Sequence, residues 1–156
     1  MSWSGNPITL GHGVGVGIIV GASVTVGLAA RTGLVAVAAD DPQAQWILAA
    51  HADAASEARW TGVVAGGLRT VQVDRVFRAG PTPQSTDDNS TWWIIDYKTA
   101  HEDGLDPKAA LPGLRSEFAP QIEAYAQFLR NLHGADAAVR GGLYYPRMAL
   151  FDWWEL

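Results

Sequence analysis

The stretch TWWIIDYKT, residues 91–99, carries the clearest structural pattern in the chain. Its apolar residues have the length and composition of one buried strand. Because alternate side chains of a strand point to the same face, Asp96 and Lys98 are expected to project side by side. A buried carboxylate and ammonium pair with each other, with a metal or with a ligand. A structural ion pair alone also explains this motif when it is considered in isolation.

A second acid lies on the segment that precedes this strand. The sequence predicts strands at 58–64 and 69–77, joined by a turn at Ala65-Gly66-Gly67. Asp74 lies where the second strand calls for an apolar residue. If 69–77 pairs antiparallel with 91–99 through the polar loop 80–90, Asp74 and Asp96 converge near one end of the pair. Two adjacent carboxylates repel each other unless a cation lies between them. Oxygen ligands of this kind favour Mg²⁺ or Mn²⁺.

Helices are expected on both sides of these strands. Asp40 or Asp41 can cap a helix that has Pro42 in its first turn. The side chains expected on its buried face are Trp46, Ile47 and Ala50.

A second helix is expected from Ala119 to His133, with Pro120 in its first turn and Gly134 as its stop. The residues before it, including Pro107 and Pro112, are expected to be irregular. A closing hairpin is expected from 140–145 and 150–154. This order predicts an α/β fold in which a mixed central sheet is flanked by helices.

Composition narrows the class of protein. The chain has 156 residues, 48% of them hydrophobic, which suits one domain with a packed core. A net charge of -5 argues against coating DNA by bulk electrostatics, but it does not exclude a metal-dependent nuclease. The absence of cysteine excludes disulfides, thiolate nucleophiles and cysteine-bound metals. It is consistent with the expected cytoplasmic location.

Residues 1–39 form a Gly/Val-rich apolar leader of uncertain structure, followed by the expected domain at 40–156. Residues 13–30 are uncharged and about as long as a membrane-spanning helix. The glycines and valines weaken a helix, and no basic cluster precedes the segment. A pair of buried strands or a disordered leader is therefore preferred to a membrane span.

Three motifs together resemble one nuclease family. VDRVF at 73–77, WIIDYKT at 93–99 and Gln121 with Tyr125-Ala126 are similar to the signature of RecB-family domains, which belong to the PD-(D/E)XK superfamily. These domains form the C-terminal part of RecB and AddA helicase-nucleases. The resemblance covers residues 40–156 and implies a restriction-endonuclease-like fold. It also implies an Mg²⁺- or Mn²⁺-dependent DNA exonuclease that acts in double-strand-break repair and recombination.

The resemblance assigns the central roles to three consecutive residues of one strand and one acid of its neighbour. Asp74 and Asp96 would hold the metal, with the Tyr97 carbonyl as an additional ligand. Lys98 would orient or activate the attacking water and stabilise charge on the phosphate. Glu57 resembles the glutamate that opens the family's first strand and is a possible additional ligand.

Gln121 and Tyr125 are four residues apart on one helix face and are expected to approach the site or the DNA strand. A core tyrosine beside a surface glutamine is the alternative. Arg75 and Arg115, together with Lys98, are the basic residues expected to contact DNA. His51 is interpreted as a helix-end or core residue.

The leader does not reproduce the helical context of the upstream histidine found in RecB relatives, although His12 lies within it. The chain also contains no P-loop, so a helicase motor would have to come from a partner. A non-catalytic DNA- or protein-binding module with the nuclease fold is the competing hypothesis.

Overall fold

The computed structural model describes residues 40–64, 66–85, 88–98 and 107–156. The expectations for the leader, including those for His12, lie outside the described residues.

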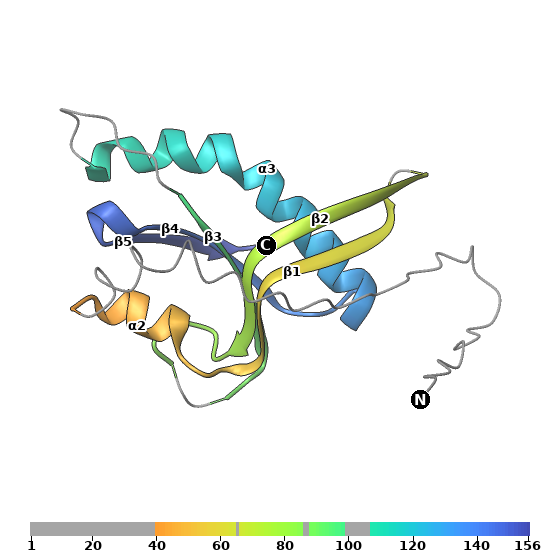
Figure 1. The fold of residues 1–156 in the computed structure, drawn as a ribbon, viewed down its shortest axis with the longest axis horizontal. Coiled ribbons are helices and arrows are strands. Elements are labelled where there is room, and N and C mark those ends of the chain that lie inside the picture. Colours follow the sequence, from red (N-terminus) through yellow and green to blue (C-terminus); the bar gives the residue numbers. More distant parts are fainter. Residues whose placement is uncertain (1–39, 65, 86–87, 99–106) are drawn as a thin grey trace.

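A mixed sheet forms the centre of the fold (Figure 1). Its five strands lie in the order β1-β2-β3-β4-β5, and β3 and β4 are parallel while every other neighbouring pair is antiparallel. The α/β class and the mixed sheet are therefore confirmed. The elements in chain order are α2 (Pro42–Leu48), β1 (Ala52–Val64), β2 (Gly67–Ala79), β3 (Thr91–Tyr97), α3 (Pro107–His133), β4 (Val139–Tyr145), a 3₁₀ turn (Pro146–Met148) and β5 (Leu150–Glu155).

The parallel pair explains the position of α3. Parallel neighbours require a crossover connection, and α3 lies on the path between the end of β3 and the start of β4. The carboxyl ends of β3 and β4 consequently share one edge of the sheet. Asp96 and Lys98 lie at this edge, beside the crossover helix.

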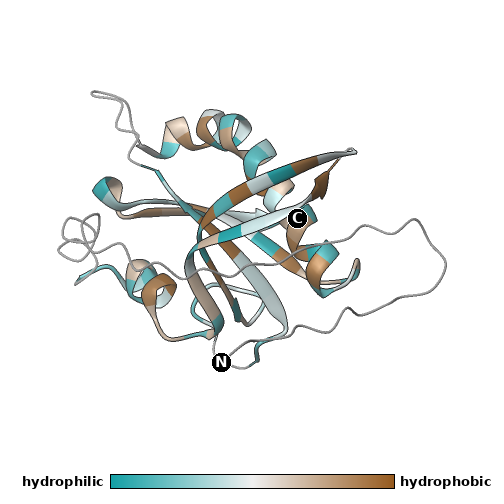
Figure 2. Cartoon of the chain, turned by 45° about the vertical axis from the view of Figure 1, so that its right-hand side comes forward, coloured by the Kyte–Doolittle hydropathy of each residue, from teal (hydrophilic) through white to brown (hydrophobic). Residues whose placement is uncertain are grey.

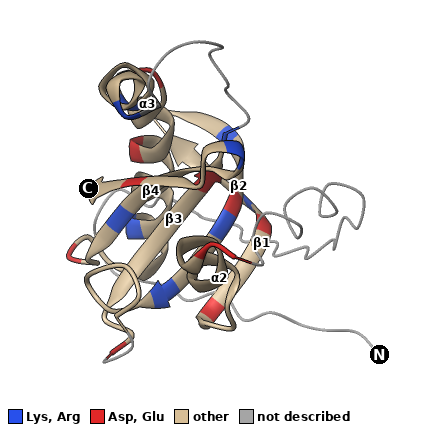
Figure 3. Ribbon diagram, turned by 90° about the vertical axis from the view of Figure 1, so that its left-hand side faces the viewer, with Lys and Arg blue, Asp and Glu red and all other residues tan. Residues whose placement is uncertain are grey.

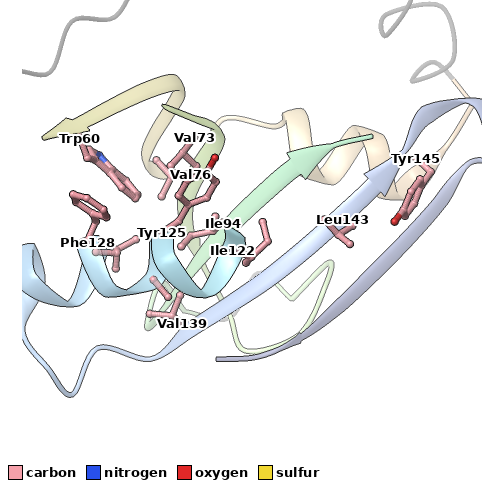
Figure 4. Close-up of a cluster of buried hydrophobic side chains, with 12 residues drawn as sticks. Trp60, Val73, Val76, Ile94, Ile122, Tyr125, Phe128, Val139, Leu143 and Tyr145 are labelled. Atoms are coloured by element: carbon pink, nitrogen blue, oxygen red, sulfur yellow. The ribbon is translucent and has the colours of Figure 1, made fainter. Parts of the chain in front are cut away.

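Each face of the sheet has its own apolar core. On one face, Ile122 of α3 shares a core with Ile94 and Leu143 (Figure 4). Leu129 of α3 belongs to the same cluster. On the other, the short helix α2 contributes Trp46 to a second core with Phe77, Trp93 and Tyr144. Apolar residues recur along the strands between these two layers (Figure 2). Burial on both faces is what makes residues 92–95 an uninterrupted apolar run.

Asp41 fixes the start of α2, as expected. Its side chain accepts a hydrogen bond from the Gln43 backbone N–H and another from the Tyr144 hydroxyl at 2.6 Å. Trp46 and Ile47 are buried as expected, but the expectation for Ala50 was wrong because α2 ends at Leu48 and leaves Ala50 exposed.

The crossover helix α3 is longer than expected. It begins at Pro107, so the irregular stretch expected around Pro107 and Pro112 is instead helical. Apolar residues at helical spacing, including Leu111, Leu114 and Phe118, pack against the core and offset the backbone hydrogen bonds that proline cannot make. Gly134 ends the helix with a φ of 108°, as expected. Among the described helices, none combines the length and apolar composition needed to cross a bilayer.

The β1–β2 hairpin bends near its middle (Figure 1). Ala55 and Ala58 both face the α3 core although three positions separate them, and Val73 and Val76 show the same slip on β2. Glu57, between the two alanines, has a φ of 53°. We call residues 58–64 and 66–73, beyond this bend, the hairpin arm. The arm leans over α3.

Candidate metal centre

The two predicted metal-binding acids lie on adjacent strands where β2 and β3 separate. The antiparallel register pairs Val76 with Ile94 and Arg75 with Ile95. One further step along each strand reaches Asp74 and Asp96, so the same register sets them opposite each other. Charged residues of both signs occupy this part of the sheet (Figure 3).

The Asp74 side chain makes a hydrogen bond to β3 where the backbone pairing of β2 and β3 has ended. Its Oδ2 accepts a hydrogen bond of 2.9 Å from the Tyr97 backbone N–H, just beyond the last paired residues. The side chain is therefore held in line with the end of β3. Its carboxylate lies within electrostatic range of both Asp96 and Lys98.

Asp96 and Lys98 form a shielded ion pair. Lys98 Nζ lies 2.5 Å from Asp96 Oδ2. The Lys98 side chain is 15% exposed and the Asp96 side chain is 6% exposed. This oxygen makes no hydrogen bond of good geometry among the described residues, so the ion pair is its principal interaction. The ammonium also lies 3.8 Å from the centre of the Phe118 ring. The pair is largely removed from water, which strengthens its electrostatics.

Gln121 and Tyr125 of α3 extend this arrangement. Gln121 Oε1 accepts a hydrogen bond of 3.3 Å from Lys98 Nζ, and Gln121 Nε2 donates one of 2.6 Å to the Tyr125 hydroxyl. The four-residue spacing thus brings both side chains to the site, and Tyr125 is also a core residue. The alternative of a core tyrosine beside a surface glutamine is therefore confirmed, and an approach of either side chain to DNA stays a prediction.

Burial and negative charge perturb the titration of the site. Burial raises the pKa of Asp74, and the nearby charges of Asp96 and Glu57 raise it further, against the lowering effects of the Tyr97 hydrogen bond and Lys98. Burial also raises the pKa of the Tyr125 hydroxyl, which therefore remains protonated near neutral pH. A carboxyl whose charged form is disfavoured gains from a cation beside it.

Glu57 brings a third acid towards the centre. It falls between the pairs Ser56↔Arg75 and Ala58↔Val73, and is therefore across from Asp74 on β1. The side chain is half-buried. Within the described part of the chain, however, no three His, Cys, Asp or Glu side chains form a group that could hold an ion.

The side chains present suit one kind of cation. Mg²⁺ commonly binds one or two carboxylates and completes its shell with water, which Asp74 and Asp96 can provide. The principal interaction of the buried Asp96 Oδ2 is with Lys98, and the ionised form of Asp74 is disfavoured. Both observations fit a site in which added positive charge would be favourable. The set lacks the nitrogen and sulfur ligands that zinc prefers.

The two arginines expected at DNA make internal contacts. Arg75 donates to the carbonyls of Ile47 and Ala49 and to Ser56 Oγ, so it joins the end of α2 to β1. Arg115 makes a bidentate ion pair with Asp152. DNA contact by either residue remains a prediction.

His51 has the helix-end position that the sequence suggested. Its ring stacks on Phe77, and its Nε2 lies 2.6 Å from the Trp46 carbonyl oxygen.

Sequence reasoning missed Phe118 as a neighbour of Lys98. The available signal was its position three residues before Gln121, which places both on one side of a helix. The sequence predicted a helix that begins at Ala119, so Phe118 was not placed on the same helix face as Gln121.

Comparison with protein-family models and with curated proteins found no match for the chain.

Proposed function

We propose that this chain is a metal-dependent DNA exonuclease module with a restriction-endonuclease-like fold, built around Asp74, Asp96 and Lys98. The observation that carries the proposal is the register of β2 and β3, which sets two acids opposite each other beside a shielded lysine. The resemblance to RecB-family domains supports the same assignment. A helicase motor that supplies the DNA strand belongs to the proposal as a partner.

Asp74 and Asp96 would hold Mg²⁺ or Mn²⁺, together with the Tyr97 carbonyl and with Glu57 as an additional ligand. When bound, the ion supplies positive charge to the scissile phosphate and favours ionisation of water. The Tyr97 N–H keeps the Asp74 carboxylate oriented at the end of β3. Burial by α3 restricts competing water around Asp96.

Lys98 would act on the attacking water and the phosphate. Asp96, Gln121 and the Phe118 ring contact its ammonium and fix its position. These three groups would position Lys98 and would not themselves contact the substrate. A cation bound to the Asp96 carboxylate would weaken the ion pair between Asp96 and Lys98. The Lys98 ammonium would then interact with the phosphate. Preorganised positive charge of this kind stabilises the negative charge that develops in the transition state.

The test is cleavage of a 5′-labelled linear single-stranded DNA by the full chain with Mg²⁺, with Mn²⁺ and with a chelator. We expect cleavage that requires the metal and is lost in Asp74→Asn and Asp96→Asn. Asp136→Asn is the matched control, because Asp136 is exposed in the turn after α3. Metal-independent cleavage, or full activity in both site variants, would refute the proposal.

A non-catalytic nucleic-acid-binding module is the second candidate. It is favoured by the absence of a three-ligand group within the described residues and by the engagement of Lys98 in internal contacts. Titration calorimetry with Mg²⁺ and Mn²⁺ separates the two functions. Binding that disappears in Asp96→Asn supports the nuclease, whereas DNA binding without metal binding or cleavage supports the module.

A further inference from the structure

An open groove lies beside the candidate metal centre, between the hairpin arm and α3. It has a volume of about 640 Å³. Gln121 and Tyr125 form part of its wall, so the residues that reach Lys98 also line the groove. The remaining lining residues are Val64, Arg69, Thr70, Val71, Gln72, Ala124 and Phe128.

The register of the arm shows which way Arg69 points. Arg69 pairs with Gly62, and a Cβ at Gly62 would lie 3.1 Å from Phe128 of α3. Opposed residues of an antiparallel pair project to the same face of the sheet. The Arg69 side chain therefore points to the side of the arm that faces α3. Arg59 is three positions from Gly62 and projects to the opposite side.

The charge of the groove comes from one residue. Among the described residues that line it, Arg69 alone is charged. Arg69 is exposed, and it has no hydrogen-bond or ion-pair partner within the described part of the chain. The arm as a whole contains Arg59 and Arg69 and no acid, in a chain with a net charge of -5. Its groove face therefore offers an unneutralised guanidinium.

The other walls offer apolar and aromatic surface. Val64 and Val71 are partly buried on the arm, and the largely buried aromatic side chains of Tyr125 and Phe128 line the groove from α3. Unpaired nucleotides combine phosphates that bind basic groups with base faces that contact aromatic and apolar side chains. In a duplex these base faces are stacked within the helix and are not available.

We infer that the groove binds a segment of single-stranded DNA that leads to the metal centre, with Arg69 contacting a backbone phosphate. This inference rests on the proposed function for the destination of the strand. The groove favours an unpaired strand, because its lining pairs one phosphate-binding group with apolar walls.

The experiment measures fluorescence anisotropy of a fluorescein-labelled oligothymidylate with the full chain in a chelator, so that cleavage plays no part. Arg69→Gln should weaken binding by about tenfold, the value of one charge-assisted hydrogen bond. It should also reduce the dependence of log affinity on log salt by about one phosphate contact. A blunt duplex of equal length should compete poorly.

Arg59→Gln is the matched control. It removes the same charge from the same arm, but Arg59 is not among the described residues that line the groove, and its guanidinium already donates a hydrogen bond to Gln72, which does line it. We expect little change in affinity. Equal weakening by both variants would indicate general electrostatics and overturn the groove, as would wild-type affinity in Arg69→Gln or no binding by the wild-type chain.

The outcomes also separate this inference from the proposed function. An effect specific to Arg69→Gln in a chain that shows no Mg²⁺-dependent cleavage supports the groove and refutes the nuclease. Metal-dependent cleavage with unchanged binding and unchanged KM in Arg69→Gln supports the nuclease and refutes the groove. Circular dichroism of each variant checks the fold, which should be intact because Arg69 is exposed.

Discussion

Asp74 Oδ2 accepts a hydrogen bond of 2.9 Å from the Tyr97 N–H, so a side chain closes the sheet where the β2–β3 ladder ends. This hydrogen bond favours the ionised carboxylate. Burial and the charge of Asp96 nevertheless outweigh it and raise the pKa of Asp74. The pairing of β2 with β3 thus ends in a hydrogen bond to the Asp74 carboxylate, whose negative charge is unfavourable in the metal-free fold.

We expect Asp74→Asn to raise the melting temperature of the metal-free protein at neutral pH by a few degrees. The asparagine oxygen can still accept from Tyr97, while the repulsion from Asp96 is removed. Because the folded-state pKa is raised, the penalty is present above that pKa and disappears as the pH falls through it. Melting temperatures of both proteins across acidic pH should therefore converge. A variant less stable than wild type at neutral pH would contradict this.

The same titration should limit activity in acid. Protonation of Asp74 removes a proposed metal ligand, so metal and proton compete for one carboxylate. We expect the rate to fall at a higher pH than an ordinary aspartate would give, and the midpoint to move to lower pH as the Mg²⁺ concentration increases. Initial rates at several Mg²⁺ concentrations test this. A midpoint independent of Mg²⁺ would separate the pH effect from metal binding.

Lys98→Met should destabilise the metal-free fold by about 3 kcal/mol, because Asp96 would be left as a buried charge without its partner. Mg²⁺ should restore more stability to this variant than to wild type, since the ion would replace the lost positive charge. Thermal melts with and without Mg²⁺ measure both effects. Lys108→Met is the control, at an exposed position of α3. Equal responses to Mg²⁺ in wild type and Lys98→Met would argue against an ion beside Asp96.

The strands were predictable because their signals are local. The apolar run at 92–95 and the turn at 65–67 define β3 and the β1–β2 hairpin, and alternation places Asp96 beside Lys98. Even the meeting of Asp74 with β3 follows from pairing two successive strands. These features depend on neighbours close in sequence.

The remaining features depend on contacts that local patterns do not encode. Pro112 argues against a helix by propensity, yet the packing of Leu111 and Phe118 extends α3 through it. The bend at Glu57 shifts which residues of the arm face α3, so Arg69 could not be assigned to a groove by alternation along the strands. Arg75 was expected at DNA because the sequence does not reveal its internal partners, the carbonyls at the end of α2, which are far away along the chain.

Gln121→Ala should lower the cleavage rate by about tenfold with little effect on stability. Gln121 joins Lys98 to Tyr125 through hydrogen bonds of 3.3 and 2.6 Å, and each such bond contributes about 1 kcal/mol. Tyr125→Phe keeps the core ring and removes the hydroxyl. If Tyr125 acts through Gln121, the double variant should be no slower than Gln121→Ala. Gln127→Ala, also exposed on α3, is the control. Additive losses would show that the two residues act independently.

Arg75→Lys distinguishes a structural arginine from a DNA contact. The guanidinium donates to the Ile47 and Ala49 carbonyls at 3.1 and 2.8 Å and to Ser56 Oγ at 3.1 Å. Lysine keeps the charge, but its donors radiate from one atom and cannot span all three acceptors. We expect a loss of about 2 kcal/mol in unfolding free energy, chiefly from the part-buried Ile47 carbonyl left without a donor. Because the charge is retained, the salt dependence of DNA binding should be unchanged. Denaturant unfolding and anisotropy titrations over a range of salt concentrations measure the two effects. Weakened DNA binding with unaltered stability would instead assign Arg75 to the DNA surface.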